Sequence, residues 1–296
     1  MRQLAPLVIF LFLSVGVYGQ SDDVLVAVDN SNVRQKKKKK RYRLPEIDLS
    51  HWKVTLPISD NNRPIEVEPP EILEYATNSI LVPFMYNDST DGSLVFHAYP
   101  ESTTANTKYS RTELREQMEP GSNSVNWKFS EGGLMKGTMR MEAVSKDRGG
   151  KYHKVIIMQI HGRLSNDQRD QIGQKDNNAP PILKIYWQDG KIRVKTKELT
   201  NNAVSPEGVL FEEAWKDDRG RTFEEEVGFN KFNIEVKVSK GKLVVSLNKG
   251  EFFVYDNASI RRWDVFENYF KAGNYLQTRD EGAFAKVKFY KLEISH

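Results

Sequence analysis

The chain has 296 residues, of which 39% are hydrophobic and 11% aromatic, so it is long enough to form a sizeable core. It contains no cysteine, which excludes disulfide bonds, thiolate catalysis and cysteine metal ligands. Of its 44 basic and 40 acidic side chains, nine basic and three acidic ones precede residue 44. Residues 44–296 therefore hold 35 basic and 37 acidic groups, so any anion-binding site there must be local.

The first 19 residues have the pattern of a secretion signal. Arg2 precedes an apolar run from Leu4 to Val17, and Gly19 is a small residue suited to cleavage. The run is short for a membrane span, and an uncleaved N-terminal anchor is the alternative. We expect a secreted protein, extracellular or periplasmic, without membrane contact after the signal is removed.

Residues 20–43 are polar and then strongly basic, with five consecutive lysines at 36–40. They lack hydrophobic periodicity after Val28, which predicts a disordered basic linker. A lysine run also occurs in nucleic-acid-binding segments. A solvated tail is the simpler interpretation in an exported protein, so we expect no nucleic-acid partner and a single domain over 44–296.

From about residue 44 onward the chain has the pattern of short strands, and 211–215 is a candidate helical turn. Gln-Asp-Gly at 188–190 predicts a hairpin turn, and 163–181 predicts a long polar loop. An unbroken series of ten or more short strands predicts an all-β fold. We expect one antiparallel β-sandwich of jelly-roll type with a concave substrate cleft. The predicted strands are 80–85, 94–99, 133–143, 154–161, 182–187, 191–197, 232–238, 242–247, 252–255 and 285–294.

Three stretches place polar side chains on one face of a predicted strand. In 110–116, Arg111, Glu113 and Arg115 share a face. Two guanidiniums beside a carboxylate can hold one arginine rigid while the other binds a ligand carboxylate. The alternative is an ion-pair ladder on a solvated face.

The second stretch, 154–161, ends with Gln159 and His161 on one face, together with residues 155 and 157. Residues 156, 158 and 160 form the expected core face. A histidine that ends an apolar strand beside an amide is either structural or a proton acceptor.

The third stretch, 269–277, carries two phenols, an ammonium and an amide on one face, with a glycine between them. A strand that only covered a core would place apolar residues there, so this face is expected to bind a polar, anionic group. The five residues of this face are Tyr269, Lys271, Gly273, Tyr275 and Gln277.

Tyr275 is a candidate general acid or base if a neighbouring cation lowers its pKa. Lys271 is on the same face but roughly 13 Å away along a flat strand. Arg111 or His161 on an adjacent strand would therefore be a closer partner.

Together these faces supply arginine, glutamine, histidine, lysine and tyrosine. They lack a pair of isolated carboxylates for glycoside hydrolysis, and the five histidines have no metal-ligand spacing. We therefore expect no metal and no cofactor. The set suits proton abstraction beside a carboxylate and loss of the group one carbon further on, which is the β-elimination of a uronic acid polymer.

The three stretches resemble, in this order, the signature motifs of the alginate lyases of polysaccharide lyase family 7. They read Arg-Thr-Glu-Leu-Arg-Glu at 111–116, Gln-Ile-His at 159–161 and Tyr-Phe-Lys-Ala-Gly-Asn-Tyr-Leu-Gln at 269–277. Trp-Lys-Val-Thr-Leu-Pro at 52–57 resembles the opening strand of the family. The resemblance covers about residues 45–296.

The resemblance implies a jelly roll whose concave cleft is lined by the motifs and binds alginate. It implies that Arg111 and Gln159 neutralise the substrate carboxylate, with His161 as base for guluronate and Tyr275 as acid. For mannuronate, Tyr275 would serve as both base and acid. The expected substrate-binding residues are Lys271, Arg115, Glu113, Gln277 and Tyr269.

Finer properties follow from the same resemblance. Ile160, rather than valine, is associated in the family with activity on guluronate-containing blocks, and we expect Gly273 to leave room for the sugar. Products would carry a 4,5-unsaturated uronate. The alternatives are a lyase for another polyuronide, such as ulvan or glucuronan, and a non-catalytic carbohydrate-binding jelly roll. We expect a monomer.

Overall fold

The computed structural model describes residues 42–101 and 108–296. The predicted secretion signal (1–19) lies outside the described residues, as does the predicted linker (20–43) except for its last two residues. In the described part of the chain, no helix is long and apolar enough to cross a membrane.

One sheet has eight strands, ordered β16-β15-β14-β8-β18-β5-β4, with β1 parallel to β18 beside them. All other pairs in this sheet are antiparallel. Its strands are β1 (Glu46–Ile47), β4 (Met85–Asp88), β5 (Ser93–Ala98), β8 (Gly133–Val144), β14 (Phe232–Ser239), β15 (Lys242–Leu247), β16 (Glu251–Tyr255) and β18 (Ala285–Ser295).

The other sheet has ten strands, ordered β12-β11-β10-β9-β17-β6-β2-β3, with β13 beside β11 and β7 beside β17. Every pair in it is antiparallel. Its strands are β2 (Trp52–Asp60), β3 (Arg63–Val67), β6 (Arg111–Glu116), β7 (Trp127–Lys128), β9 (Val155–Arg163), β10 (Asn178–Gln188), β11 (Lys191–Leu199), β12 (Trp215–Asp217), β13 (Arg221–Glu226) and β17 (Glu267–Leu276).

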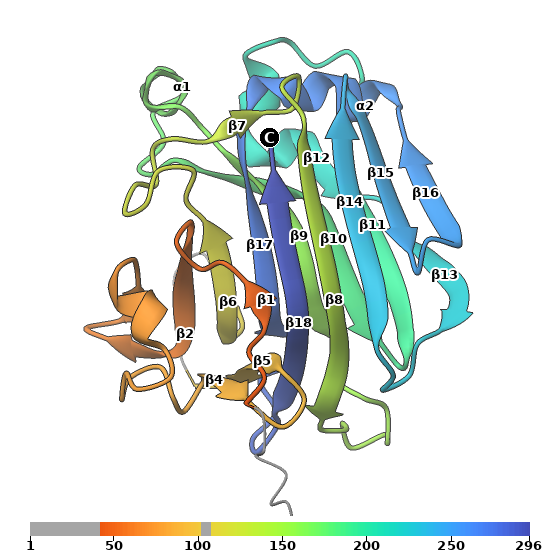
Figure 1. Cartoon of the computed structure of the whole chain (residues 1–296). Coiled ribbons are helices and arrows are strands. Elements are labelled where there is room, and N and C mark those ends of the chain that lie inside the picture. The colour runs from red at the N-terminus through yellow and green to blue at the C-terminus, as the bar shows by residue number, and fades with distance from the viewer. Residues whose placement is uncertain (1–41, 102–107) are drawn as a thin grey trace, which may run out of the picture. The chain divides into compact units, whose positions relative to one another are not determined.

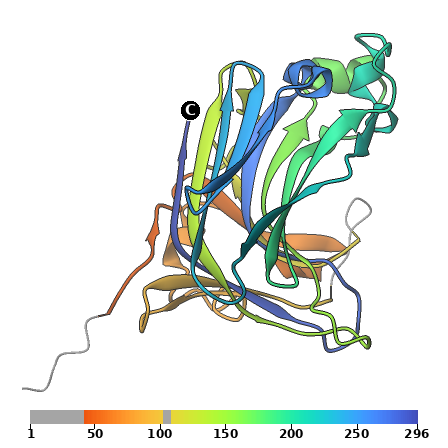
Figure 2. The same ribbon diagram turned by 90° about the vertical axis from the view of Figure 1, so that its right-hand side faces the viewer.

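The two sheets lie face to face, and short helices lie in the connections (Figures 1 and 2). Helix α1 begins at a capping box in which the Ser165 and Gln168 side chains bond each other's backbone N–H groups. The helical segments are α1 (Asn166–Gln171), α2 (Ala258–Arg262) and the 3₁₀-helices η1 (Glu71–Glu74), η2 (Gly208–Leu210), η3 (Glu212–Ala214) and η4 (Trp263–Val265).

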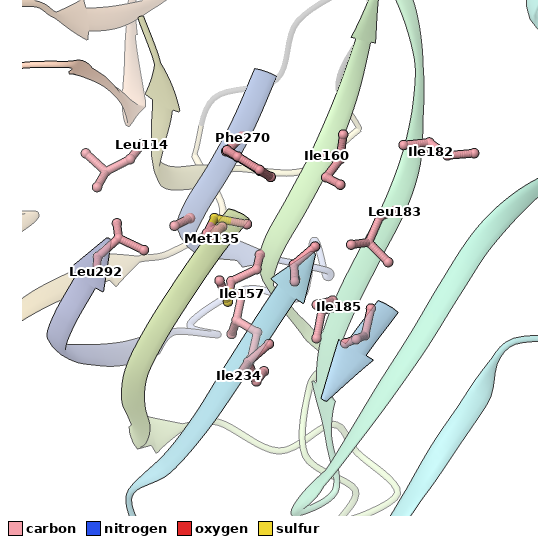
Figure 3. Packing of buried hydrophobic residues seen from close by; sticks show 14 of the residues in the cluster. Leu114, Met135, Ile157, Ile160, Ile182, Leu183, Ile185, Ile234, Phe270 and Leu292 are labelled. Carbon is pink, nitrogen blue, oxygen red and sulfur yellow. The ribbon is translucent and has the colours of Figure 1, made fainter. Parts of the chain in front are cut away.

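The core lies between the sheets because alternate side chains of each strand point inward. Met135 and Ile234 of the first sheet lie beside Phe270 and Ile157 of the second (Figure 3), and all four are at most 1% exposed. This packing confirms the predicted all-β antiparallel sandwich.

Some local predictions hold and others do not. The turn at 188–190 joins β10 to β11 with Asp189 and Gly190 both at positive φ, as a type I′ hairpin requires. The helical turn expected at 211–215 is η3. The loop expected at 163–181 is shorter, because it contains α1 and β10 already begins at Asn178.

The predicted strand 80–85 is wrong. Its first five residues form consecutive turns in which Leu81 N–H donates to Asn78 O and Phe84 N–H donates to Leu81 O. Pro83, in the middle, has no N–H to give to a ladder. Leu81 and Phe84 are buried in these turns while Ile80 and Val82 are exposed, and the strand begins only at Met85.

Candidate active site

The three motif strands are neighbours, with β17 between β6 and β9 at the centre of the ten-stranded sheet. Tyr269 pairs with His161, and Tyr275 pairs with Arg111. Directly opposed residues of adjacent strands share a face and lie within contact distance. The sheet therefore gathers the predicted site residues on its face away from the core.

Glu113 is the centre of this group, with a side chain only 1% exposed. Its carboxylate accepts a 2.5 Å hydrogen bond from Gln159 Nε2 and lies 2.5 Å from Lys271 Nζ. Arg111 Nε is 3.8 Å from the same carboxylate. Two cations and an amide thus converge on one buried anion, which leaves an excess of positive charge. Glu113 is therefore the buried anion on which Arg111, Gln159 and Lys271 converge.

Lys271 is 5% exposed. Burial and the nearby Arg111 guanidinium lower the pKa of Lys271 to about 8, although the Glu113 carboxylate opposes this shift. Its ammonium is therefore protonated at neutral pH and loses its charge in mildly alkaline solution.

The Arg115 guanidinium makes most of its hydrogen bonds within the protein. Its guanidinium donates to the backbone oxygens of Glu116 and Asn123 and to Asn126 Oδ1. It also lies 4.2 Å from the centre of the Tyr269 ring, which suits a cation–π contact. Arg115 thus holds the 123–126 loop and Tyr269 in place, and its charge still borders the cleft.

His161 lies partly buried against Tyr269, with ring centres 5.2 Å apart and an interplanar angle of 15°. Its Nδ1 is 3.0 Å from Gly162 O, so Nδ1 carries the proton and Nε2 keeps a free lone pair. Burial, together with the positive charges of Lys271, Arg111 and Arg115, lowers the pKa of His161 to about 3. The imidazole is therefore neutral and able to accept a proton at neutral pH.

Tyr275 lies beside Arg111, whose guanidinium is 5.4 Å from the ring centre, as expected from the sequence. The neighbouring cation does not lower its pKa: burial raises the pKa of Tyr275 and outweighs the opposing effect of Arg111. The phenol therefore keeps its proton at neutral pH, which suits a general acid better than a general base.

Residues 155–157 of β9 lie on the faces opposite to those expected. Val155 and Ile157 belong to the core cluster, whereas Ile156 pairs with Tyr275 of β17 and Tyr186 of β10. The pairing of β9 shifts register against both neighbours, between Ala272 and Tyr275 and between Ile185 and Tyr186. A one-residue irregularity moves the side chains on one side of it to the other face of the sheet. The sequence prediction assumed regular alternation along the whole strand and therefore placed these three residues wrongly.

Gly273 is required by the backbone. Its φ is +138°, and an added Cβ would lie 2.7 Å from Thr112 O on β6. Any larger residue would separate β17 from β6, so this glycine allows close approach of two strands. Its expected role as room for the sugar has no support in this geometry.

Part of the polar face lines an open hollow of about 810 Å³. Of the predicted site residues, Arg111, Arg115, Tyr269 and Lys271 line it, whereas Gln159, His161 and Tyr275 do not. Among the described lining side chains six are basic and two, Glu66 and Asp176, are acidic, so the hollow has an excess of positive charge in a nearly neutral domain. Several members were not anticipated from the sequence, since each is an isolated basic residue on a different segment. The basic lining residues are Lys53, Arg63, Arg111, Arg115, Arg163 and Lys271.

The buried carboxylate of Glu116, paired with the partly exposed His296, supports β17 from its core side. Glu116, 1% exposed, accepts from the Phe270 backbone N–H and from Trp127 Nε1, and lies 2.6 Å from His296 Nε2. Burial lowers the pKa of His296, but the Glu116 carboxylate more than offsets this, so the pKa is raised. Phe270 lies between Tyr269 and Lys271, so this contact fixes the strand that carries them.

Gln277 lies at the other end of the face, where its side chain donates to Tyr275 O and borders a second hollow. Within the described residues, no group of three or more His, Asp or Glu side chains could hold a metal ion.

The chain is similar to several known proteins. A family model described as alginate lyase matches residues 47–296. No curated protein matches the chain. Alginate lyase A1-II′, described as a member of polysaccharide lyase family 7, is 31% identical with a TM-score of 0.66, over 84% of this chain and 96% of that one.

A His→Asn, Tyr→Phe variant of the same lyase, in complex with substrate (GGMG), is 29% identical with a TM-score of 0.66, over 84% and 94%. An alginate lyase of Pseudomonas aeruginosa, 24% identical with a TM-score of 0.61 over 84% and 100%, shares the fold. The family match, the fold and the ordered motifs lead to one conclusion: the chain belongs to the alginate lyases of polysaccharide lyase family 7.

Proposed function

We propose that this protein is a secreted lyase that cleaves the 1,4-glycosidic bond of alginate by β-elimination. The observation that carries the proposal is the convergence of Arg111, Gln159 and Lys271 on one buried carboxylate beside a positive hollow, which Arg111 and Lys271 line. The similar lyase that binds GGMG as substrate when one His and one Tyr are replaced supports it.

Neutralisation of the substrate carboxylate is the first requirement. The C5 proton of a uronate is only weakly acidic while the adjacent carboxylate keeps its full charge. Arg111 and the second N–H of the Gln159 amide would bind this carboxylate, and Lys271 would add positive charge beside it. Preorganised donors and cations of this kind stabilise the enolate-like intermediate, in which negative charge moves onto the carboxylate oxygens.

Proton transfer completes the reaction. His161 Nε2 would take the C5 proton, and the C5–H electron pair would form the C4–C5 double bond as the C4–O4 bond breaks. Tyr275 would give its phenolic proton to the departing oxygen, and solvent would restore both groups. The neutral imidazole and the protonated phenol are the forms that these two roles need at neutral pH.

The same geometry favours guluronate over mannuronate. In guluronate the C5 proton and the leaving oxygen lie on opposite sides of the ring, so two residues must act. In mannuronate they lie on one side, and Tyr275 would need to ionise first, which its raised pKa disfavours. Ile160 is fully buried and cannot contact the sugar, so any effect it has on block preference must be indirect.

The remaining properties are proposals from the sequence. Residues 1–19 would direct export, and the basic segment 20–43 would lie outside the catalytic unit. The protein would act as a monomer, with alginate as its partner, and the proposed chemistry uses only its own side chains.

Incubating the purified protein with alginate tests the function directly. A C4–C5 double bond conjugated with the carboxylate absorbs in the ultraviolet, so absorbance should rise with time, and new reducing ends should appear in equal number. Ulvan and glucuronan serve as matched substrates. A rise with one of these and none with alginate would contradict the substrate, and binding without any rise would indicate a carbohydrate-binding module.

The pH dependence of kcat/KM should report Lys271. Its charge is present below a pKa of about 8 and is lost as pH rises through that value, so kcat/KM should fall above about pH 8. In Lys271→Arg the cation persists to much higher pH, and the alkaline limb should move upward. Lys136→Arg, on the other sheet, is the control. If kcat/KM fell at the same pH in the wild type and in Lys271→Arg, the fall would be due to the ionisation of a group other than Lys271.

A further inference from the structure

Strands β10 and β11 follow β9 in the same sheet (Figure 1). A second hollow lies on this side of the motif strands. It has a volume of about 420 Å³. Its described lining includes three cations and two phenols, and no carboxylate. The residues that matter here are Tyr109, Lys154, Tyr186, Arg193, Lys195 and Gln277.

The strand register connects this hollow to the active site. Gln159 of β9 pairs with Lys184 of β10, which pairs with Lys195 of β11. On the other side, Gln159 pairs with Lys271 of β17, and the pairing continues through β6 to β2. One row of side chains therefore crosses six strands, and all but one of its members are cations. In order, the row is Lys53, Arg115, Lys271, Gln159, Lys184 and Lys195.

A second row runs beside the first. Tyr275 pairs with Arg111 on one side and with Ile156 on the other, and Ile156 leads through Tyr186 to Arg193. The proposed proton donor thus lies between two arginines of the same row. Both rows enter the second hollow at β11, through Lys195 and Arg193.

The cations at this end exceed the anions available to them. Lys184, Lys195 and Lys197 share the single carboxylate of Asp217, at 2.6, 4.0 and 3.1 Å. Arg193 donates to Arg219 O and Thr222 Oγ1. Among the described residues, no carboxylate lies within 4.0 Å of Arg193 or of Lys154, so this end of the sheet can accept additional negative charge.

We propose that the second hollow binds the carboxylates of uronate residues further along the polymer, with Arg193 and Lys195 as the main contacts. This inference rests on the proposed function and extends it. Strands lie about 4.7–4.9 Å apart, so the first row extends over roughly 24 Å. A polymer with a carboxylate on every sugar would cross the strands and meet cations along this length, whereas a trisaccharide at the active site would reach fewer of them.

The double variant Arg193→Gln/Lys195→Gln tests the site. It should raise KM for long alginate chains by at least about tenfold, which corresponds to the loss of one charge-assisted hydrogen bond. The increase in KM for a trisaccharide should be smaller. The rate on long chains should also become less sensitive to added salt, because fewer charge contacts remain to be screened. Lys154→Gln is an independent variant in the same hollow and should act in the same direction.

Lys237→Gln/Lys242→Gln is the matched control, since it removes two charges from the exposed side of the other sheet. Mobility in native gels that contain alginate measures binding without turnover. If alginate retards the wild type more than the Arg193/Lys195 variant, the second hollow binds alginate. This result would support the site even if the protein cleaved no polyuronide. The absence of cleavage would contradict only the proposed reaction. Equal retardation and equal KM ratios in wild type and variant would overturn the site, as would an alginate gel that retards neither protein.

Discussion

Replacing Tyr275 with phenylalanine should lower kcat on alginate by about 10²–10⁴-fold, the usual contribution of a positioned general acid. The change removes only the hydroxyl. The ring would still lie beside Arg111 and opposite Ile156, so substrate binding should change little. Loss of kcat with nearly constant KM is the signature of an interaction made only in the transition state. Initial rates of the ultraviolet absorbance rise over a range of substrate concentrations would measure both constants.

Tyr86→Phe is the control for this variant, because it removes a hydroxyl from β4 of the other sheet. It should keep wild-type kinetics, and thermal unfolding should show that both variants are folded. If Tyr275→Phe kept full kcat, the leaving oxygen would have to take its proton from another group, and Tyr269 beside His161 would be the next one to replace.

The side-chain faces of β6 and β17 were predictable because strands alternate strictly. Arg111, Glu113 and Arg115 do share a face of the sheet. On the neighbouring strand β17, Tyr269, Lys271 and Tyr275 lie on that same face. The prediction was wrong at 155–157, where β9 shifts register against both neighbours. No local residue signal marks that shift, since isoleucine and valine suit either face of a buried strand.

The charges of the site were harder to predict than its residues. The sequence placed Glu113 on the polar face, but it did not show that Glu113 would be buried with two cations and the Gln159 amide converging on its carboxylate. Burial also decides the pKa of Tyr275, which rises although a guanidinium is adjacent. Depth below the surface depends on both sheets together and cannot be read from one strand.

The row of cations was missed for a different reason. Within 184–195, basic and polar residues alternate with buried ones, which is a visible sign of a polar face. Alone, such lysines are usually solvated surface residues. Only the strand order β2-β6-β17-β9-β10-β11 aligns them with the active site, and local sequence patterns do not determine that order.

On guluronate blocks, replacing His161 with alanine should lower kcat by about 10²–10⁴-fold, because the positioned base is lost. On mannuronate blocks, where the proposed mechanism would use Tyr275 as both base and acid, the loss should be smaller. The pKa of His161, lowered to about 3, implies that the imidazole is already neutral above about pH 4. The wild-type rate on guluronate should therefore show no rise between pH 5 and 7 that depends on His161, and rates on purified blocks of each kind would test this.

Added imidazole provides the matching control for His161→Ala. The substitution leaves a space beside the Tyr269 ring, against which the native imidazole packs. Free imidazole that enters it could restore part of the guluronate activity, and more so above its own pKa, where its lone pair is free. An equal loss on both kinds of block, with no rescue, would mean that His161 acts by holding Tyr269 and the sugar in place. Proton abstraction would then have to be assigned to Tyr275 for both epimers, despite its raised pKa.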